Sequence, residues 1–316
     1  MNNKLKTNTN LRIPIIYGIL ASFFFSFTFV INRSMSLGGG SFLWSGVMRY
    51  LFVIIILYIY LLVKGELKGV FLSIKENFLP WFIFSNIGFS LFYFALSLST
   101  VYGESWLAAS FWQLTIVFGM LLTPVFGEPI PTKPLLFSSL IILGVVLLQM
   151  ENARVVDISE SFFTLISMSI AAIAYPFGNR GMLKLTKGKL NSIQRVFGMA
   201  LMTVPFWNIV AIYALVTGGP PSAGQIFQTF LIAVSSGVIA TVLFFKATGM
   251  VREDKEKLAI VETTQSAELI FTIIVGVTLL KDPLPSTTGI IGIVLIISGM
   301  FLCTLAPRID FKGRKR

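Results

Sequence analysis

The sequence predicts an all-α integral membrane protein whose ten transmembrane helices form two inverted five-helix repeats. Of its 316 residues, 55% are hydrophobic and 12% are charged, whereas about a quarter of the residues in a soluble domain are charged. Apolar stretches recur along the whole chain, and about 20 such residues cross a bilayer as one helix. Short motifs of the first half also return in the second half in the same order.

Hydropathy places the ten spans in chain order. The first follows a basic tail and ends in Asn32-Arg33. A signal peptide has a shorter apolar core and a small-residue cleavage site, so we expect this span to be retained. The fifth and sixth spans are the shortest. In full, the spans are expected at residues 13–33, 42–63, 79–99, 105–126, 134–150, 161–178, 192–216, 226–250, 258–280 and 286–306.

The placement of charge predicts the topology. The net charge is +11, and of the Lys and Arg residues between the spans only Arg33, Arg154 and Lys281 fall on the side opposite the two termini. Cytoplasmic segments are rich in Lys and Arg, so we expect both termini in the cytoplasm of a bacterium and the chain in its plasma membrane. The basic surplus is then a topology signal that contacts the lipid bilayer, and no nucleic-acid partner is expected. The organisation is a tail (1–12), repeat 1 (13–152), repeat 2 (153–306) and a basic tail (307–316).

Several kinds of chemistry have no support in the sequence. The chain contains no histidine and one cysteine, Cys303, so His-based proton relays, disulfides and most zinc or copper sites are not expected. No P-loop, catalytic triad pattern or dinucleotide fingerprint occurs. We therefore expect no enzyme activity, no ATP-driven transport, no cofactor and no metal.

The two halves of the chain share short motifs at nearly constant offset. Each half contains five spans, an odd number, so a duplicated second half must enter the membrane upside down. Secondary transporters use this architecture and place the substrate site near the midplane between the repeats. The matched motifs are residues 32–35 with 179–182 (Asn-Arg-x-Met), Arg49 with Arg195, and residues 128–131 with 282–285 (acid-Pro-x-Pro).

The chain resembles the drug/metabolite transporter superfamily in three features. It has ten spans in a five-plus-five repeat, an arginine early in spans two and seven, and an acid-Pro pair after spans four and nine. Within it, the chain is most similar to the ten-helix (EamA-like) branch, and there to the multidrug resistance efflux transporters. The resemblance covers nearly the whole chain and implies fold and transport more directly than substrate. In the four-helix relatives a glutamate in the first helix binds the cationic drug and the proton in turn. Here the first span offers no acid, so that site cannot be carried over; Ser22 and Ser26 are its candidate substrate- or proton-binding residues.

Span nine carries acids at membrane depth. On a helical wheel, Glu262, Gln265 and Glu268 share one face with Thr272 and Gly276. A charged side chain in the bilayer costs roughly 2.5–3.5 kcal/mol on insertion scales, so it faces a partner or a watery path. Glu268 lies about 15 Å into the span, close to the midplane. We expect Glu268 to bind substrate or proton, with Gln265 and Glu262 beside it; the alternative is that both acids are held by structural partners.

Two ion pairs are predicted as gates at opposite mouths of the transporter. Arg195 and Glu262 lie at similar depth near the cytoplasmic side, and Arg49 and Glu104 occupy the corresponding outer positions of the other repeat. A static structural clamp explains the same residues.

Aromatic and amide side chains in two other spans are candidate cavity liners. Trp112 and Gln113 lie deep in span four, and Tyr175 precedes Pro176 in span six. Aromatic surfaces suit flat lipophilic or cationic ligands through cation–π contact. Ordinary helix packing is the alternative. Small residues of spans five and ten indicate close helix contact, which we assign to packing within one monomer rather than to dimerisation.

These observations predict a secondary active transporter that exports lipophilic or cationic small molecules by alternating access, with the proton as coupling ion. Protonation of Glu268 would release the cation, and deprotonation would recapture it. One alternative is a transporter of a polar metabolite such as an amino acid, in which Arg49 or Arg195 holds a carboxylate and Glu268 an amine. A second alternative is a non-transporting membrane scaffold or sensor. The chain is expected to act as a monomer or a homodimer.

Overall fold

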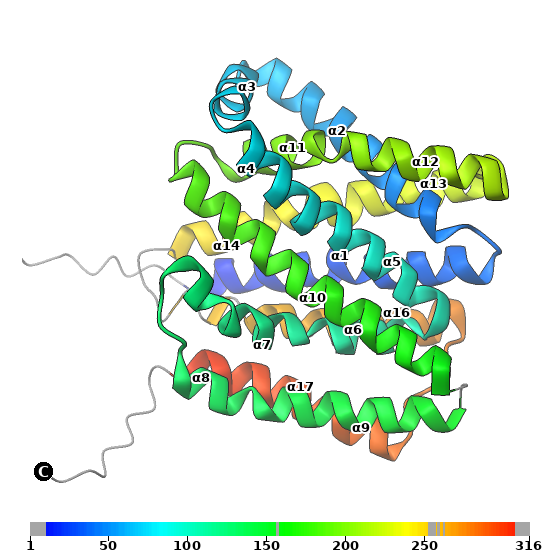
Figure 1. Cartoon of the computed structure of the whole chain (residues 1–316). Helices are drawn as coiled ribbons and strands as arrows, with labels where there is room; N and C mark the ends of the chain where they lie inside the picture. Colours follow the sequence, from blue (N-terminus) through cyan, green and yellow to red (C-terminus); the bar gives the residue numbers. More distant parts are fainter. Residues whose placement is uncertain (1–10, 156–157, 252–256, 258–259, 262, 307–316) are drawn as a thin grey trace, which may run out of the picture.

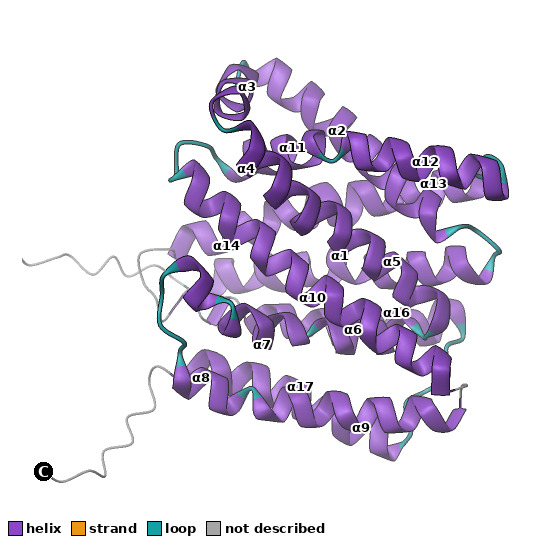
Figure 2. Cartoon of the chain, viewed as in Figure 1, coloured by secondary structure: helices purple, strands orange, loops and turns teal. Residues whose placement is uncertain are grey.

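The computed structural model describes residues 11–155, 158–251, 257, 260–261 and 263–306 (Figure 1). Within these ranges, all regular secondary structure is helical (Figure 2). The predicted all-α class is therefore confirmed. Glu262 and most of both predicted tails lie outside the described residues.

Four predicted spans are single uninterrupted helices, and the others are divided into shorter segments. The uninterrupted ones are α1 (Arg12–Leu37), α2 (Phe42–Lys64), α10 (Ile158–Thr186) and α17 (Thr287–Leu305). In the first half, the third span consists of α4 (Phe78–Ser85), η1 (Asn86–Leu91) and α5 (Phe92–Tyr102), the fourth of α6 (Ser105–Trp112), α7 (Leu114–Leu121) and η2 (Thr123–Phe126), and the fifth of α8 (Thr132–Phe137) and α9 (Ser139–Val155). In the second half, the seventh span consists of α11 (Ser192–Met202) and α12 (Val204–Gly218), the eighth of α13 (Ala223–Ile232), η3 (Ala233–Ala240) and α14 (Thr241–Val251), and the ninth of η4 (Thr263–Gln265), α16 (Ser266–Val275) and η5 (Gly276–Leu280). A short helix, α3 (Leu67–Glu76), connects the second and third spans.

The helix lengths are compatible with ten spans. Among the described residues, eight helices are long and apolar enough to cross a membrane, and the pair α11 and α12 adds a ninth if it is counted as one span bent by 47°. The shorter apolar helix Ser105–Leu121 lies where the fourth span is expected. The sixth span, expected to be among the shortest, is instead a helix of 29 residues. Past Gly178 the helix accommodates two charged residues, because the side chains of Arg180 and Lys184 donate to the carbonyl oxygens of Gly119 and Phe126.

The bend between α11 and α12 has a local cause. Pro205 stands at the start of α12 and has no backbone N–H to donate to the preceding turn. At the break, the carbonyl oxygen of Ala200 accepts hydrogen bonds from the Thr203 backbone nitrogen at 3.1 Å and from its hydroxyl at 2.6 Å. Pro176, by contrast, lies inside α10 without dividing it.

Small residues hold the fifth and tenth spans together. A Cβ on Gly144 would collide with the carbonyl oxygen of Gly292, and a Cβ on Gly299 would lie 3.0 Å from the backbone nitrogen of Ile141. Helices α9 and α17 therefore lie side by side at one edge of the bundle (Figure 1). These glycines serve packing within the chain.

The remaining helices contact one another in pairs that correspond between the halves. Helix α1 packs against η3 and α14 of the eighth span, and α10 packs against η1 and α5 of the third. Helix α1 also contacts α16, as α10 contacts α6 and α7. Of the three π-helical segments among the described residues, η1 and η3 occupy corresponding places in the third and eighth spans, and η5 ends the ninth. This arrangement is compatible with two inverted repeats, and it leaves a cavity between the halves.

Candidate functional site

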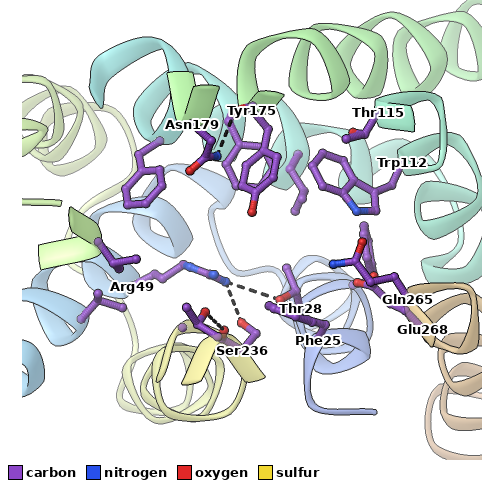
Figure 3. Close-up of a pocket in the computed structure, with 18 of the residues that line it drawn as sticks. Phe25, Thr28, Arg49, Trp112, Thr115, Tyr175, Asn179, Ser236, Gln265 and Glu268 are labelled. Atoms are coloured by element: carbon purple, nitrogen blue, oxygen red, sulfur yellow. Dashed lines mark hydrogen bonds between the residues drawn. The ribbon is translucent and has the colours of Figure 1, made fainter. Parts of the chain in front are cut away.

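A cavity of about 160 Å³ lies at the centre of the bundle, between the two halves of the chain (Figure 3). Side chains from α1, α2, α5, α7, α10, α11, α14 and α16, with their adjoining segments, form its wall. Most of these residues are apolar or aromatic. Two of them, Arg49 and Glu268, carry charge.

Glu268 enters the cavity from the first turn of α16. Its side chain is only 6% exposed. No side chain or backbone group of the described residues donates a hydrogen bond to its carboxylate, and no described cation pairs with it. The positive end of the helix dipole favours a carboxylate in this first turn, which helps to accommodate a buried acid. Gln265, the residue just before α16, lines the same side of the cavity.

Arg49 enters the cavity from α2, across from Glu268 (Figure 3). Its Nη1 donates to the hydroxyl of Ser236 at 3.0 Å and to that of Thr28 at 3.5 Å. The guanidinium carbon lies 4.3 Å from the centre of the Tyr93 ring, in a cation–π contact. No described carboxylate lies within ion-pair distance of Arg49. The guanidinium is therefore positioned by neutral groups and keeps an uncompensated positive charge.

Three aromatic rings form one wall of the cavity. The ring centroids of Phe92 and Tyr175 are 4.9 Å apart, and the Trp112 centroid lies 5.3 Å from each of them. Figure 3 shows the Tyr175 hydroxyl pointing toward the middle of the cavity and Trp112 on the same side of the view as Gln265 and Glu268. No partner among the described residues is recorded for the Tyr175 hydroxyl or the Trp112 indole nitrogen. This wall offers an apolar face with two polar groups available to a ligand.

Gln113 follows Trp112 at the break between α6 and α7, and it also lines the cavity. Its amide nitrogen donates to the carbonyl oxygen of Ala109 at 3.1 Å. The predicted liners Gln265, Glu268, Trp112, Gln113 and Tyr175 are thus gathered around one cavity.

The structure places Ser22 and Ser26 outside this group. The Ser22 hydroxyl donates to the carbonyl oxygens of Gly18 and Thr264, at 2.9 and 2.8 Å, and so links α1 to η4. The Ser26 hydroxyl donates to the carbonyl oxygen of Phe23 at 2.6 Å. Both side chains are fully buried. Short hydroxyls in a helix satisfy themselves on nearby carbonyls in this way, so neither serine is a cavity residue here.

The predicted ion pair between Arg49 and Glu104 is not formed. Arg49 lies seven residues into α2, about 10 Å along the helix axis, whereas Glu104 precedes the first residue of α6. The acid that does contact the start of α6 is Asp282, whose Oδ2 accepts hydrogen bonds from the Ser105 hydroxyl at 2.6 Å and from its backbone nitrogen at 3.3 Å. A connection from the second half of the chain thus caps a helix of the first half.

The second predicted gate cannot be traced in full, because Glu262 lies outside the described residues. Arg195 does not line the cavity; its Nη2 donates to the Ser192 hydroxyl at 3.2 Å, within the first turn of α11. Hydropathy did not single out Thr28, Thr115, Asn179 or Ser236, which also line the cavity. Small polar residues of this kind are common in membrane helices, so only Asn179, inside a repeated motif, carried a signal in the sequence.

Comparisons with known proteins identify the family of this chain and two of its relatives. Residues 12–308 match the model of the EmrE family, described as "Putative multidrug resistance efflux transporter". The uncharacterized protein YjlA of Bacillus subtilis (strain 168) is 43% identical over 307 residues, covering 93% of this chain and 95% of that protein. An uncharacterized 42.1 kDa protein of Shouchella clausii, from the 3′ region of an intracellular alkaline protease, is 39% identical over 264 residues, covering 80% of this chain and 69% of that protein.

A solved crystal structure has a similar fold. Its TM-score with this chain is 0.64 at 14% sequence identity, and the match covers 94% of this chain and 98% of that one. At this identity the likeness concerns the arrangement of the helices alone.

Proposed function

The chain belongs to the EmrE family of multidrug resistance efflux transporters, and from this premise we propose that it is a proton-coupled secondary transporter of amine-bearing organic molecules. It binds them in the central cavity and moves them by alternating access. Membership of this family supports transport of a small molecule across a membrane. The choice of substrate charge and of the coupling ion depends on the cavity itself.

One observation carries the proposal: the Glu268 carboxylate is buried, faces the cavity and has no partner among the described residues. A buried carboxylate without a partner is stable only if it binds a cation or takes up a proton. An ammonium group and a proton therefore compete for Glu268. Competition at one site couples the movement of the substrate to an opposite movement of protons.

The helix architecture supports alternating access. The contacts of α1 correspond to those of α10 when the two halves are exchanged, which supports an inverted repeat with one half at residues 13–152 and the other at 153–306. Spans three, four, eight and nine are interrupted at residues that line the cavity. Unwound or π-helical segments let parts of a span move separately. Rocking of the two halves would expose Glu268 to one side of the membrane at a time.

The remaining features of the proposal come from the sequence. The bias of Lys and Arg toward the segments on the side of the termini supports a cytoplasmic position for both ends, in the plasma membrane of a bacterium. The glycines of α9 and α17 are used within the chain, which favours a monomer as the working unit.

The test is proton movement in proteoliposomes loaded with a pH-sensitive dye. Adding an organic cation on one side should move protons in the opposite direction when the wild-type protein is present. Glu268→Gln should abolish this movement. Glu104→Gln removes an acid that does not line the cavity and serves as the matched control. Proton movement of wild-type size in the Glu268→Gln variant would exclude Glu268 as the coupling group.

A second candidate is transport of a polar metabolite that contains an acidic group. The observation that favours it is Arg49, whose guanidinium faces the same cavity without a described acidic partner. In both candidate functions the substrate binds in the same cavity, beside Glu268, and is transported across the membrane.

A further inference from the structure

We infer that the substrate is a zwitterion with a small aromatic or similarly apolar body: its ammonium group binds Glu268, its carboxylate binds Arg49, and its ring packs against Trp112 and Tyr175. This inference rests on the proposed transport function and specifies the chemical class of the substrate. It depends on the simultaneous presence of two opposite charges in one cavity.

Arg49 requires an anion that the described residues do not supply. A guanidinium does not lose its proton in proteins, so it cannot become neutral as a carboxylate can. Its recorded contacts are two hydroxyls and one aromatic ring. Only Nη1 is used in those hydrogen bonds, which leaves the donors of Nη2 and Nε. A carboxylate accepts two parallel hydrogen bonds from such a guanidinium.

Glu268 does not supply this anion, because the two side chains lie on opposite sides of the cavity and form no ion pair (Figure 3). An amine alone would neutralise Glu268 and be repelled by Arg49. An acid alone would neutralise Arg49 and be repelled by ionised Glu268. A zwitterion satisfies both charges, and the occupied cavity is then electrically neutral.

The size and surface of the cavity restrict the body of the substrate. The volume of about 160 Å³ is close to that of an engineered cavity of about 150 Å³ that binds benzene. The Phe92, Trp112 and Tyr175 rings, inclined to one another by 44–71°, provide an apolar aromatic wall in the cavity that Arg49 and Glu268 also line. In this conformation the cavity fits a compound with one ring and two short charged groups.

Three probes with the same phenyl ring test the inference: phenylalanine carries both charged groups, phenethylamine lacks the carboxylate, and 3-phenylpropionate lacks the ammonium group. Binding is measured calorimetrically on the purified protein, and transport is measured in proteoliposomes with a pH gradient. The wild-type protein should bind phenylalanine at least 10-fold more tightly than either of the other probes. Arg49→Gln should remove this preference by weakening phenylalanine at least 10-fold while leaving phenethylamine unchanged or tighter.

Two further variants separate charge from folding effects. Arg49→Lys keeps the positive charge but loses the fork of donors, so it should retain part of the preference for phenylalanine. Lys246→Gln removes an exposed cation that contacts Tyr17 and does not line the cavity, so the preference should remain.

Each other result has a definite meaning. If phenethylamine binds and moves as well as phenylalanine, and Arg49→Gln leaves their ratio unchanged, the zwitterion inference is wrong and the cation transporter stands. If 3-phenylpropionate is preferred, Glu268 does not bind the substrate as an anion and both proposals fail. If none of the three probes binds or moves with the wild-type protein, the zwitterion inference fails. Proton movement driven by larger organic cations then decides the proposed function separately.

Discussion

Replacing Glu268 with glutamine distinguishes a binding role for this carboxylate from a structural one. Glutamine has nearly the same shape and no charge. The wild-type carboxylate is 6% exposed and has no partner among the described residues, so its removal breaks no recorded interaction. We expect the melting temperature of the ligand-free protein to remain the same or to rise. A structural ion pair would behave in the opposite way, since removing one partner of a buried pair costs about 3–5 kcal/mol.

The effect on binding follows from the contact that is lost. A hydrogen bond to a charged group contributes about 1.5–3 kcal/mol, and about 1.4 kcal/mol corresponds to a tenfold change in affinity. Amine-bearing substrates should therefore bind to the Glu268→Gln variant roughly 10- to 140-fold more weakly.

The pH dependence provides an independent readout. Only the ionised carboxylate attracts an ammonium group, so the affinity of the wild-type protein for an amine should increase as the pH rises. The measurement is kept below the pH range in which the amine itself loses its proton. The charged or titratable groups of the described residues that share the cavity with Glu268 are Arg49, Tyr50 and Tyr175; of these, the arginine stays charged throughout. The Glu268→Gln variant should show a flat profile, as measured by calorimetric titration at several pH values. A lowered melting temperature with an unchanged affinity and an unchanged pH profile would refute the reasoning.

Three further predictions concern packing, capping and the aromatic wall. Gly144→Val should lower the free energy of unfolding by about 1–3 kcal/mol because the new side chain meets the backbone of α17. The control is Gly249→Val, where nothing lies within 4 Å of the added Cβ. Equal melting temperatures of the two variants would contradict the packing of α9 against α17. Asp282→Ala removes two hydrogen bonds at the start of α6 and should lower the free energy of unfolding by about 1–2 kcal/mol, whereas Glu104→Ala should change it little. Chemical denaturation measures both variants, and an equal loss of stability would argue against Asp282 as the cap. Trp112→Ala should weaken binding of an aromatic substrate roughly 2- to 10-fold, since an aromatic pair contributes about 0.5–1.5 kcal/mol. Calorimetric titration with phenylalanine measures this change in affinity. A similar loss of affinity for a non-aromatic zwitterion would show that the ring contact is not the cause.

The sequence predicts the class of fold well because hydropathy is a local property. Each apolar run must form a helix, since hydrocarbon offers no partner for backbone polar groups. The sixth span shows the limit of this rule. Arg180 and Lys184 suggest an end to the helix in the sequence, but their long side chains reach carbonyl groups of neighbouring segments, and the helix continues to Thr186.

The candidate site is predictable where a residue violates a local rule. Glu268 is an acid within an apolar stretch, and Arg49 is a cation within another, so both are recognisable as functional candidates. Their partners are not recognisable. Pairing of Arg49 with Glu104 follows from the repeat, but in the structure the seven residues that separate Arg49 from the start of α2 place its guanidinium beside Ser236 and Tyr93.

By itself, the sequence determined that this chain crosses the membrane many times as helices, that it contains matched motifs in its two halves, and that Glu268 stands within an apolar stretch. Composition and spacing along one helix are sufficient for these conclusions. Only the tertiary structure decided that Glu268 and Arg49 face one small cavity from opposite sides, beside a wall of three aromatic rings. The rotation of each helix about its axis depends on packing against segments far away in the chain, and that rotation decides which polar groups share a site.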